Sequence, residues 1–188
     1  LRAWPELPEW AVLEAEKFYQ FATEKRWPTY GLSPRVFIVC DALKRVWRAA
    51  HPNVVALWGE LEQAAITAIV HGETTVVRDR LEFSRHKAWL RVRLPSGRYL
   101  CYPGAQYNPG QADKKLKRSA QDDPKRGVSY MGLHQYSRQW RRIKSYGGKF
   151  LENFSQASAA DVLTDGMQAA ERDGYCTVLH VHDELVTE

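Results

Sequence analysis

The sequence contains few cysteines and no long apolar run. Its three cysteines, Cys40, Cys101 and Cys176, are far apart and fit no C-x-x-C spacing. An odd, scattered set argues against a disulfide framework or a zinc ribbon and favours a reducing compartment, so we expect a cytoplasmic protein. No run of about 18 apolar residues is present, so no membrane-spanning segment is expected. The N-terminus, Leu1-Arg-Ala-Trp-Pro, has neither an initiator Met nor a signal-peptide pattern, which indicates a piece of a longer chain.

Charge is distributed unevenly along the chain. The 188 residues carry a formal net charge of +5, and 44% of them are apolar and 26% charged, which is typical of a globular protein. Residues 78–149 hold 18 Lys/Arg against 5 Asp/Glu, a net charge of +13, whereas residues 150–188 have a net charge of −7. A basic middle beside an acidic end indicates a track for a polyanion next to a cation site, although a merely solvated basic face gives the same pattern.

The first part of the chain is predicted to be helical. Residues 9–26 place apolar side chains near helical spacing, with acidic residues early and Lys25-Arg26 late, which suits the helix dipole. A second helix is expected to open at Ser33-Pro34, where a capping residue precedes a proline at the first helical position. A third helix is expected from about Val54 to Val70.

The period of the apolar residues changes to two between Thr74 and Tyr107, which predicts short strands. In the segment 88–94, Leu90, Val92 and Leu94 alternate with arginines, so one face of this strand is expected to be apolar and the other cationic. Pro95-Ser-Gly97 is expected to form the turn of an antiparallel hairpin. The four expected strands cover residues 75–77, 80–83, 88–94 and 98–102.

A polar segment and an aromatic, basic segment follow the expected strands. Residues 108–127 include the run Lys114-Lys-Leu-Lys-Arg118 and are predicted to form a loop. Residues 128–149 interleave aromatic with basic side chains, which can stack on bases and meet phosphates; the alternative is an amphipathic segment whose aromatic residues belong to the core. Gly147-Gly148 predicts a sharp turn or a close backbone approach before a fourth helix over residues 149–172.

The last eleven residues, 178–188, place a polar cluster between two apolar runs. Such runs are typical of buried strands, so we expect a hairpin whose turn carries the neighbouring carboxylates of Asp183 and Glu184. Because like charges repel and burial of carboxylates is costly, a divalent cation is expected there. Three alternatives stay open: a metallohydrolase that uses His180 and His182, a nucleic-acid-binding module without a metal, and a turn with only local hydrogen bonds.

The closing segment, residues 175–186, resembles motif C of the family A DNA polymerases, and residues 152–163 resemble the helix that precedes motif C in that family. Residues 94–103 resemble a hairpin near the palm, and residues 135–149 are most similar to phage or prophage members. The resemblance covers roughly residues 30–188. It implies an α+β fold, in which residues 1–73 form a helical, fingers-like segment. Residues 74–188 would then supply palm-proximal hairpins, a basic segment, a long helix and the motif C hairpin.

The family's functional residues carry over where its motifs match. Asp183 matches the second metal-binding aspartate of the palm, and Glu184 matches its acidic neighbour. His182 matches a residue near the primer end, and Gln156 matches a helix glutamine that touches the minor groove of the primer–template. The resemblance implies a DNA-templated DNA polymerase that uses two Mg²⁺ ions, dNTPs and primer–template DNA. Further DNA contacts are predicted, from proximity in the chain alone, at Arg138, Arg141, Arg142, Lys144 and Lys149.

Two motifs of the family have no counterpart in the sequence. Motif A would supply the first metal-binding aspartate, and the basic helix of motif B would hold the triphosphate; in the family both precede the matched stretch. We therefore expect a palm-plus-fingers part of a polymerase that works in the host or bacterial cytoplasm. It is expected to depend on the remainder of the polymerase chain and to lack polymerase activity on its own.

Overall fold

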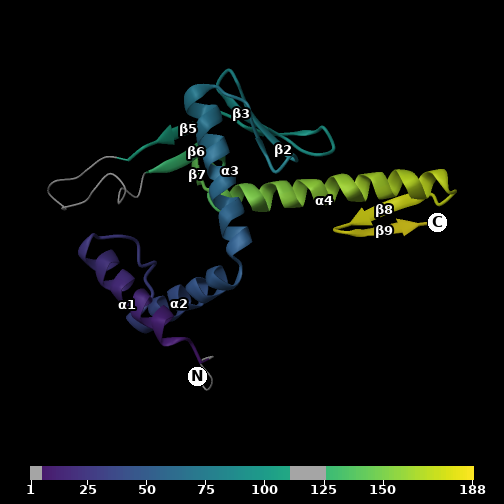
Figure 1. The fold of residues 1–188 in the computed structure, drawn as a ribbon. Coiled ribbons are helices and arrows are strands. Elements are labelled where there is room, and N and C mark those ends of the chain that lie inside the picture. The colour runs from purple at the N-terminus through teal and green to yellow at the C-terminus, as the bar shows by residue number, and fades with distance from the viewer. Residues whose placement is uncertain (1–5, 111–125) are drawn as a thin grey trace. The chain divides into compact units, whose positions relative to one another are not determined.

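The computed structural model describes residues 6–110 and 126–188, and these contain four helices and nine strands arranged in three sheets (Figure 1). The predicted α+β class is confirmed. The basic run Lys114-Lys-Leu-Lys-Arg118 of the predicted loop lies outside the described residues. Within the two described ranges, no helix has the length and apolar character needed to cross a membrane.

The described residues group into two compact units. Of the described residues, 6–57, 108–110 and 126–127 belong to the first unit, and residues 58–107 and 128–188 belong to the second. The boundary falls within helix α3 (Pro52–His71), so this helix contributes residues to both units. The functional division at residue 73, which the family resemblance implies, stays a prediction.

The first unit is built on the packing of helix α1 (Glu9–Glu24) against helix α2 (Pro34–Ala50). Ala11, Ala15 and Ala42 are fully buried at this interface, with larger apolar side chains packed around them. Small residues allow two helix backbones to approach closely, so the surrounding side chains can close the core. Both helices begin close to the residues predicted from the sequence.

The predicted start of α2 is confirmed, with one correction to its capping. Ser33 takes the N-cap position with an extended backbone, and Pro34 is the first helical residue, but the Ser33 side chain makes no capping hydrogen bond. The start of α2 therefore relies on the fixed backbone angle of Pro34. α3 begins in the same way at Pro52, immediately after His51 ends α2.

The second unit contains a four-stranded antiparallel sheet in which each strand pairs with the next along the chain. Leu90, Val92 and Leu94 are buried while Arg93 is exposed, so the predicted apolar and cationic faces are confirmed. The predicted turn at residues 95–97 also forms, and Gly97 has a φ of 87°, which a side chain would strain. The strands are β1 (Thr75–Val77), β2 (Leu81–His86), β3 (Trp89–Arg93) and β4 (Tyr99–Tyr102).

The aromatic and basic segment 128–149 supplies two strands and the start of a helix. β6 (Gly127–Leu133) pairs with β7 (Trp140–Ser145) as an antiparallel hairpin, and β5 (Gln106–Asn108) lies on the other side of β6. From the sequence, no strands were assigned to this segment. Side chains alternate along a strand, so Trp140, Arg142 and Lys144 of β7 share one face.

Helix α4 (Gly147–Arg172) starts two residues earlier than predicted, at a point where the backbone touches α3. A Cβ atom at Gly147 would lie far inside van der Waals contact of the Trp58 carbonyl group, so only glycine fits. Gly147 N–H also donates to Glu62 Oε2 over 3.3 Å. The close backbone approach predicted for Gly147-Gly148 is therefore confirmed.

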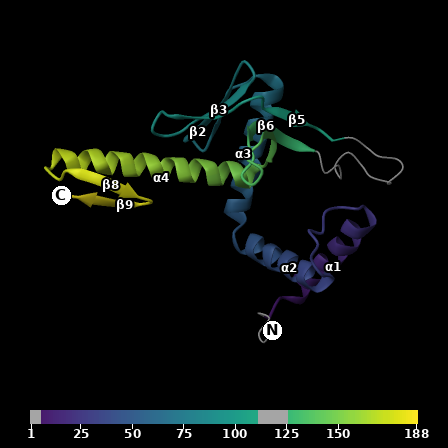
Figure 2. The ribbon, with the colours of Figure 1, turned by 180° about the vertical axis from the view of Figure 1, so that it is seen from behind.

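The N-terminal half of α4 is the part that packs against the sheets. The ring of Phe150 is buried and meets Phe83 and Tyr102 edge to face, with centroids 6.0 and 5.3 Å apart. Gly147 and Phe150 are the buried residues of the helix in the described structure. Figures 1 and 2 show the helix continuing past the sheets, with the closing hairpin alongside its C-terminal half.

Replacement of Gly147 by alanine is expected to destabilise the chain by about 1–3 kcal/mol, because the added Cβ collides with the Trp58 carbonyl group. Gly166→Ala is the matched control in the same helix, since no atom lies within 4 Å of its added Cβ. This control should stabilise the chain by about 0.5–1 kcal/mol through helix propensity. Urea unfolding followed by circular dichroism measures both variants, and equal midpoints would contradict the close approach.

Candidate nucleic-acid interface

The predicted closing hairpin is present, and its turn carries the acidic pair. Strand β8 (Thr177–Val181) pairs antiparallel with β9 (Glu184–Thr187), and His182 and Asp183 form the turn between them. His182 has a left-handed backbone with a φ of 54°, which is uncommon for a residue other than glycine. The side chains of His182, Asp183 and Glu184 are all exposed. The turn therefore presents two carboxylates and an imidazole to solvent.

The expectation that the two strands of this hairpin are buried is wrong. Val178 and Leu179 are each 56% exposed, and Val181 and Val186 are each 46% exposed. The physical reason is that β8 and β9 form a two-stranded sheet with no third strand among the described residues, and α4, beside which they lie, leaves these side chains exposed. The apolar runs predicted the strands correctly but could not show what covers them.

The acidic pair is not part of a complete metal site in the described part of the chain. No group of three or more His, Cys, Asp or Glu residues there could hold a metal ion. The metallohydrolase alternative requires further ligands beside His180 and His182, and no described residue supplies one. Mg²⁺ differs, because one or two carboxylates together with waters and substrate phosphates are sufficient to hold it. A magnesium site at Asp183 and Glu184 stays a prediction.

Gln156 lies in a groove between α4 and the strands β4 and β6, which we call the Gln156 groove. Its volume is about 460 Å³. Within it, Asn153 Nδ2 donates to the Tyr102 hydroxyl oxygen over 3.1 Å, and the Tyr102 ring meets Tyr130 edge to face. The lining residues are Arg98, Leu100, Cys101, Tyr102, Tyr130, Asn153, Gln156, Ala157 and Ala160.

Tyr102 is the buried polar group at the floor of the Gln156 groove. Burial raises the pKa of its hydroxyl to about 12, against the smaller opposing effect of the Asn153 hydrogen bond. The hydroxyl therefore stays protonated at neutral pH. It accepts a hydrogen bond from Asn153 and keeps its own proton, so the groove combines amide, hydroxyl and guanidinium groups that suit a polar ligand.

Three side-chain hydrogen bonds, which we call the Arg98 clasp, join the β3–β4 turn to α4 beside this groove. Arg98 Nε donates to Asp161 Oδ1 over 2.7 Å, and Arg98 Nη2 donates to the Ala157 carbonyl oxygen over 2.9 Å. Ser96 Oγ donates to Asp161 Oδ2 over 2.6 Å. The hydrogen bond from Ser96 lowers the pKa of Asp161; desolvation opposes this shift, and Arg98 adds to it. The clasp fixes one side of the groove that contains Gln156.

The basic residues predicted on β7 point to both faces of the strand. Side chains alternate along a strand, so Arg142 and Lys144 share one face and Arg141 lies on the other. Arg142 Nη1 donates to the Gly104 carbonyl oxygen over 3.0 Å and to Ser129 Oγ over 3.3 Å. Arg142 therefore ties β7 to its neighbours, whereas the exposed Arg141 guanidinium lies away from these contacts.

The other two predicted basic contacts lie at the ends of the β6–β7 hairpin and of α4. Arg138 is exposed in the loop before β7 and has a φ of 52°. Lys149, in the first turn of α4, forms an ion pair of 2.8 Å with Glu152, and that hydrogen bond raises the pKa of its ammonium group. Binding a phosphate at Lys149 would compete with this pair, so its contribution to DNA affinity is expected to be small.

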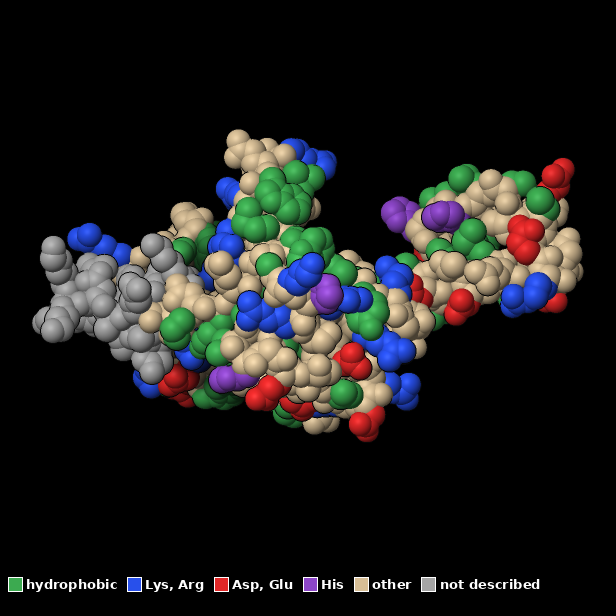
Figure 3. Space-filling model, turned by 90° about the horizontal axis from the view of Figure 1, so that it is seen from above, with side chains coloured by type: hydrophobic (Ala, Val, Ile, Leu, Met, Phe, Trp, Pro, Cys, Tyr) green, Lys and Arg blue, Asp and Glu red, His purple; other side chains and the backbone are tan. Residues whose placement is uncertain are grey.

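The turn of the closing hairpin points back along α4. Figures 1 and 2 show β8 and β9 beside the C-terminal half of the helix, with their turn directed toward its middle. Thr177 N–H donates to Glu171 Oε1 over 2.6 Å, which ties the base of the hairpin to the helix. Figure 3 shows red carboxylates and purple histidines at this end, together with green hydrophobic side chains and blue basic ones. The net charge over residues 150–188 is −7.

Comparison with known proteins identifies a relative of the chain. Over 146 residues it is 36% identical to the DNA polymerase of Bacillus phage SP02, and this alignment covers 78% of the chain. It covers 21% of the phage protein, so the chain spans about a fifth of the length of this curated relative. No protein-family model and no solved structure matches the chain. The chain is thus related to a phage DNA polymerase over most of its length.

Sequence reasoning missed the residues that hold the Gln156 groove together. Arg98 was noticed as part of a family-like hairpin, but nothing in the sequence paired it with Asp161, 63 residues later. Tyr102 and Asn153, 51 residues apart, were also not singled out. A contact between distant residues leaves no periodic trace in one sequence, so it required the folded structure.

The Arg98 clasp predicts a specific pH dependence of stability. Because the pKa of Asp161 is lowered in the folded chain, its contribution is complete at neutral pH and is lost as the pH falls through that lowered pKa. Asp161→Asn should reduce the urea midpoint at neutral pH and make its decline in acid shallower. Asp165→Asn, at an exposed carboxylate one turn further along α4, is the control and should leave the profile unchanged. Identical profiles for all three proteins would contradict the clasp.

Proposed function

We propose that the chain forms the part of a family A DNA polymerase that surrounds motif C. It would contribute one carboxylate group of a two-metal site and part of the surface that holds primer–template DNA. The observation that carries the proposal is the hairpin turn that presents Asp183 and Glu184, in a chain related to a phage DNA polymerase. The activity belongs to the whole polymerase, of which this chain supplies one region.

Asp183 would hold Mg²⁺ in the complete site. Two bound Mg²⁺ ions would activate the primer 3′-hydroxyl group and stabilise the leaving pyrophosphate of a dNTP. The exposed turn leaves the Asp183 carboxylate open to an ion, with Glu184 beside it. His182 would lie near the primer end. The family's other metal-binding aspartate, in motif A, has no counterpart in these 188 residues, so the remainder of the polymerase would supply it.

The Gln156 groove would receive the minor groove of the primer–template. The minor groove displays hydrogen-bond acceptors at every base pair, and the amide of Gln156 and the guanidinium of Arg98 can donate to them. Because these acceptors are nearly the same for all base pairs, such contacts hold DNA without reading its sequence, as a polymerase requires. Phosphate contacts by Arg141 and other basic residues would add affinity.

The polymerase resemblance also predicts the compartment in which the protein would work. A phage-like polymerase would work in the bacterial cytoplasm, and the three free, exposed cysteines suit a reducing compartment. Primer–template DNA, dNTPs and the remainder of the polymerase chain would be its partners.

A nucleic-acid-binding module without catalysis is the second candidate, and the basic residues 78–149 favour it. The two candidates differ in their use of metal. A module would bind DNA equally well with and without Mg²⁺, and substitution of Asp183 and Glu184 would not affect the activity of its parent protein.

Asp183→Asn in the whole polymerase is expected to reduce Mg²⁺-dependent primer extension by about 10²-fold or more, because misalignment of the reacting groups alone has an effect of that size. DNA affinity and the unfolding midpoint should stay unchanged, since the residue is exposed at a turn. Unchanged extension by this variant would contradict the proposed role. The isolated 188-residue chain should extend no primer, and robust extension by it would overturn the expectation that two motifs come from elsewhere.

Two neighbouring arginines of β7 are expected to affect DNA binding and stability differently. Affinity for duplex DNA should fall steeply with salt through counterion release, and Arg141→Ala should reduce the slope of log K against log salt by about one. Arg142→Ala should in addition lower the unfolding midpoint, because it removes hydrogen bonds to Gly104 and Ser129. Fluorescence anisotropy over a salt series and urea unfolding measure these effects. An affinity that is insensitive to salt would contradict the interface.

A further inference from the structure

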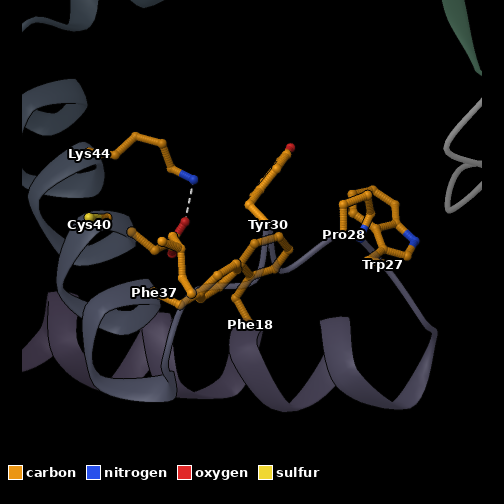
Figure 4. A pocket seen from close by; sticks show the side chains of 9 residues that line it. Phe18, Trp27, Pro28, Tyr30, Phe37, Cys40 and Lys44 are labelled. Carbon is orange, nitrogen blue, oxygen red and sulfur yellow. Dashed lines mark hydrogen bonds and ion pairs between the residues drawn. The ribbon is translucent and has the colours of Figure 1, made fainter.

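The first unit contains a recess of about 280 Å³ between α1, α2 and the segment that connects them (Figure 4). None of the residues that surround it belongs to the Gln156 groove or to the acidic turn. Four of them carry aromatic rings, and one charged pair lies at its edge. The lining residues are Phe18, Trp27, Pro28, Tyr30, Leu32, Phe37, Cys40, Asp41 and Lys44.

Stacked aromatic rings form the floor of this recess. The rings of Phe18 and Phe37 lie nearly parallel, with centroids 5.9 Å apart and an angle of 27° between their planes. Trp27 meets Phe18 edge to face at 6.3 Å and closes one end. Phe37 is buried, so the floor is part of the unit's core and is held in place by it. A rigid aromatic surface of this kind suits a flat ring laid against it.

Tyr30 stands over this floor in an unusual conformation (Figure 4). It is 82% exposed, although a tyrosine could cover part of the apolar recess beside it. Its backbone φ is 57°, in the left-handed region that disfavours large side chains, and the following Gly31 has a φ of 68°. Strained residues of this kind cluster at ligand sites because the surrounding structure enforces them. The turn therefore keeps an aromatic face open beside an aromatic floor.

The edge of the recess carries a net positive charge. Asp41 is buried and is paired with both Lys44 and Arg45. Burial raises the pKa of Asp41, but the hydrogen bonds from Lys44 and Arg45 outweigh it, so the pKa lies below its ordinary value. Lys44 Nζ and the Arg45 guanidinium also lie 5.5 and 5.9 Å from the Phe18 ring centroid. Two cations against one carboxylate leave one positive charge next to the aromatic floor. Asp41 keeps Arg45 as a partner if Lys44 turns away, so Lys44, unlike Lys149, can meet an outside anion without leaving its carboxylate unpaired.

We infer that this recess binds one unpaired base of single-stranded nucleic acid, with Lys44 meeting a phosphate of the same strand. Aromatic side chains stack on the flat rings of bases, and a neighbouring cation attracts the phosphates of the same strand. Pockets for drug-sized ligands usually measure about 300–1,000 Å³, so a recess of 280 Å³ suits one base rather than a whole nucleotide. A purely apolar protein segment would leave the positive charge unmatched. The inference rests on the proposed nucleic-acid function, in which a single-stranded template would supply the base.

The test compares two fluorescein-labelled strands that have the same phosphates, oligothymidine and its abasic counterpart. Fluorescence anisotropy with the 188-residue chain measures both affinities. Loss of base–aromatic stacking costs a factor of about 5–150, so oligothymidine should bind more tightly by a factor in this range. Tyr30→Ala should remove this preference while affinity for the abasic strand stays unchanged, and Tyr30→Phe should keep it. Tyr175→Ala, at an exposed tyrosine of the second unit, is the control.

Lys44→Gln should weaken binding of both strands by the same factor, because it removes a phosphate contact and not a base contact. Equal affinities of the unsubstituted chain for the two strands would overturn the inference. The inference would also be overturned if Tyr30→Ala lowered the unfolding midpoint but left the base preference intact. In that case Tyr30 would serve the packing of the unit and not the binding of a base. Failure of the polymerase proposal is seen separately, in the primer-extension assay of Asp183→Asn, because Asp183 lies in the second unit.

Discussion

Within the second unit, the candidate site depends on the packing of the start of α4 against α3 and the four-stranded sheet. Gly147 allows the helix to start against the Trp58 carbonyl group, and Phe150 fills the space between Phe83 and Tyr102. Burial of one phenylalanine contributes about 1.5–3 kcal/mol, more than the exposed ion pairs further along the helix. The Arg98 clasp then fixes the middle of α4, so Gln156 and the hairpin that follows the helix have defined positions within the unit.

Much of this fold could be predicted from one sequence, because its signals are local. Periodicity predicted the helices and the four-stranded sheet, and the paired glycines 147 and 148 predicted the close approach to another backbone. Local signals could not show that the closing strands are exposed, since burial depends on what covers a strand. The contacts of Arg98 with Asp161 and of Tyr102 with Asn153 were missed for the same reason. The candidate site residues came from the family resemblance, because periodicity does not identify functional residues.

The two proposed tasks, metal binding and DNA binding, belong to parts of the chain with opposite net charge. The acidic end, with Asp183 and Glu184 on a solvent-exposed turn, suits cations, whereas the basic strand β7 suits phosphates. If the chain works within a polymerase, the exposed apolar faces of β8 and β9 are surfaces on which the remainder of the palm would pack. The aromatic recess of the first unit would add a separate place for an unpaired base.

The central claim is that the Gln156 groove holds primer–template DNA. Its most direct test places a photoreactive amino acid at position 156 and measures crosslinking to a labelled primer–template, with position 162 on another face of α4 as the control. The account predicts strong crosslinks from position 156 to the duplex near the primer end and few from Val162, although that residue is 71% exposed. Equal crosslinking from both positions, or none from position 156, would contradict it.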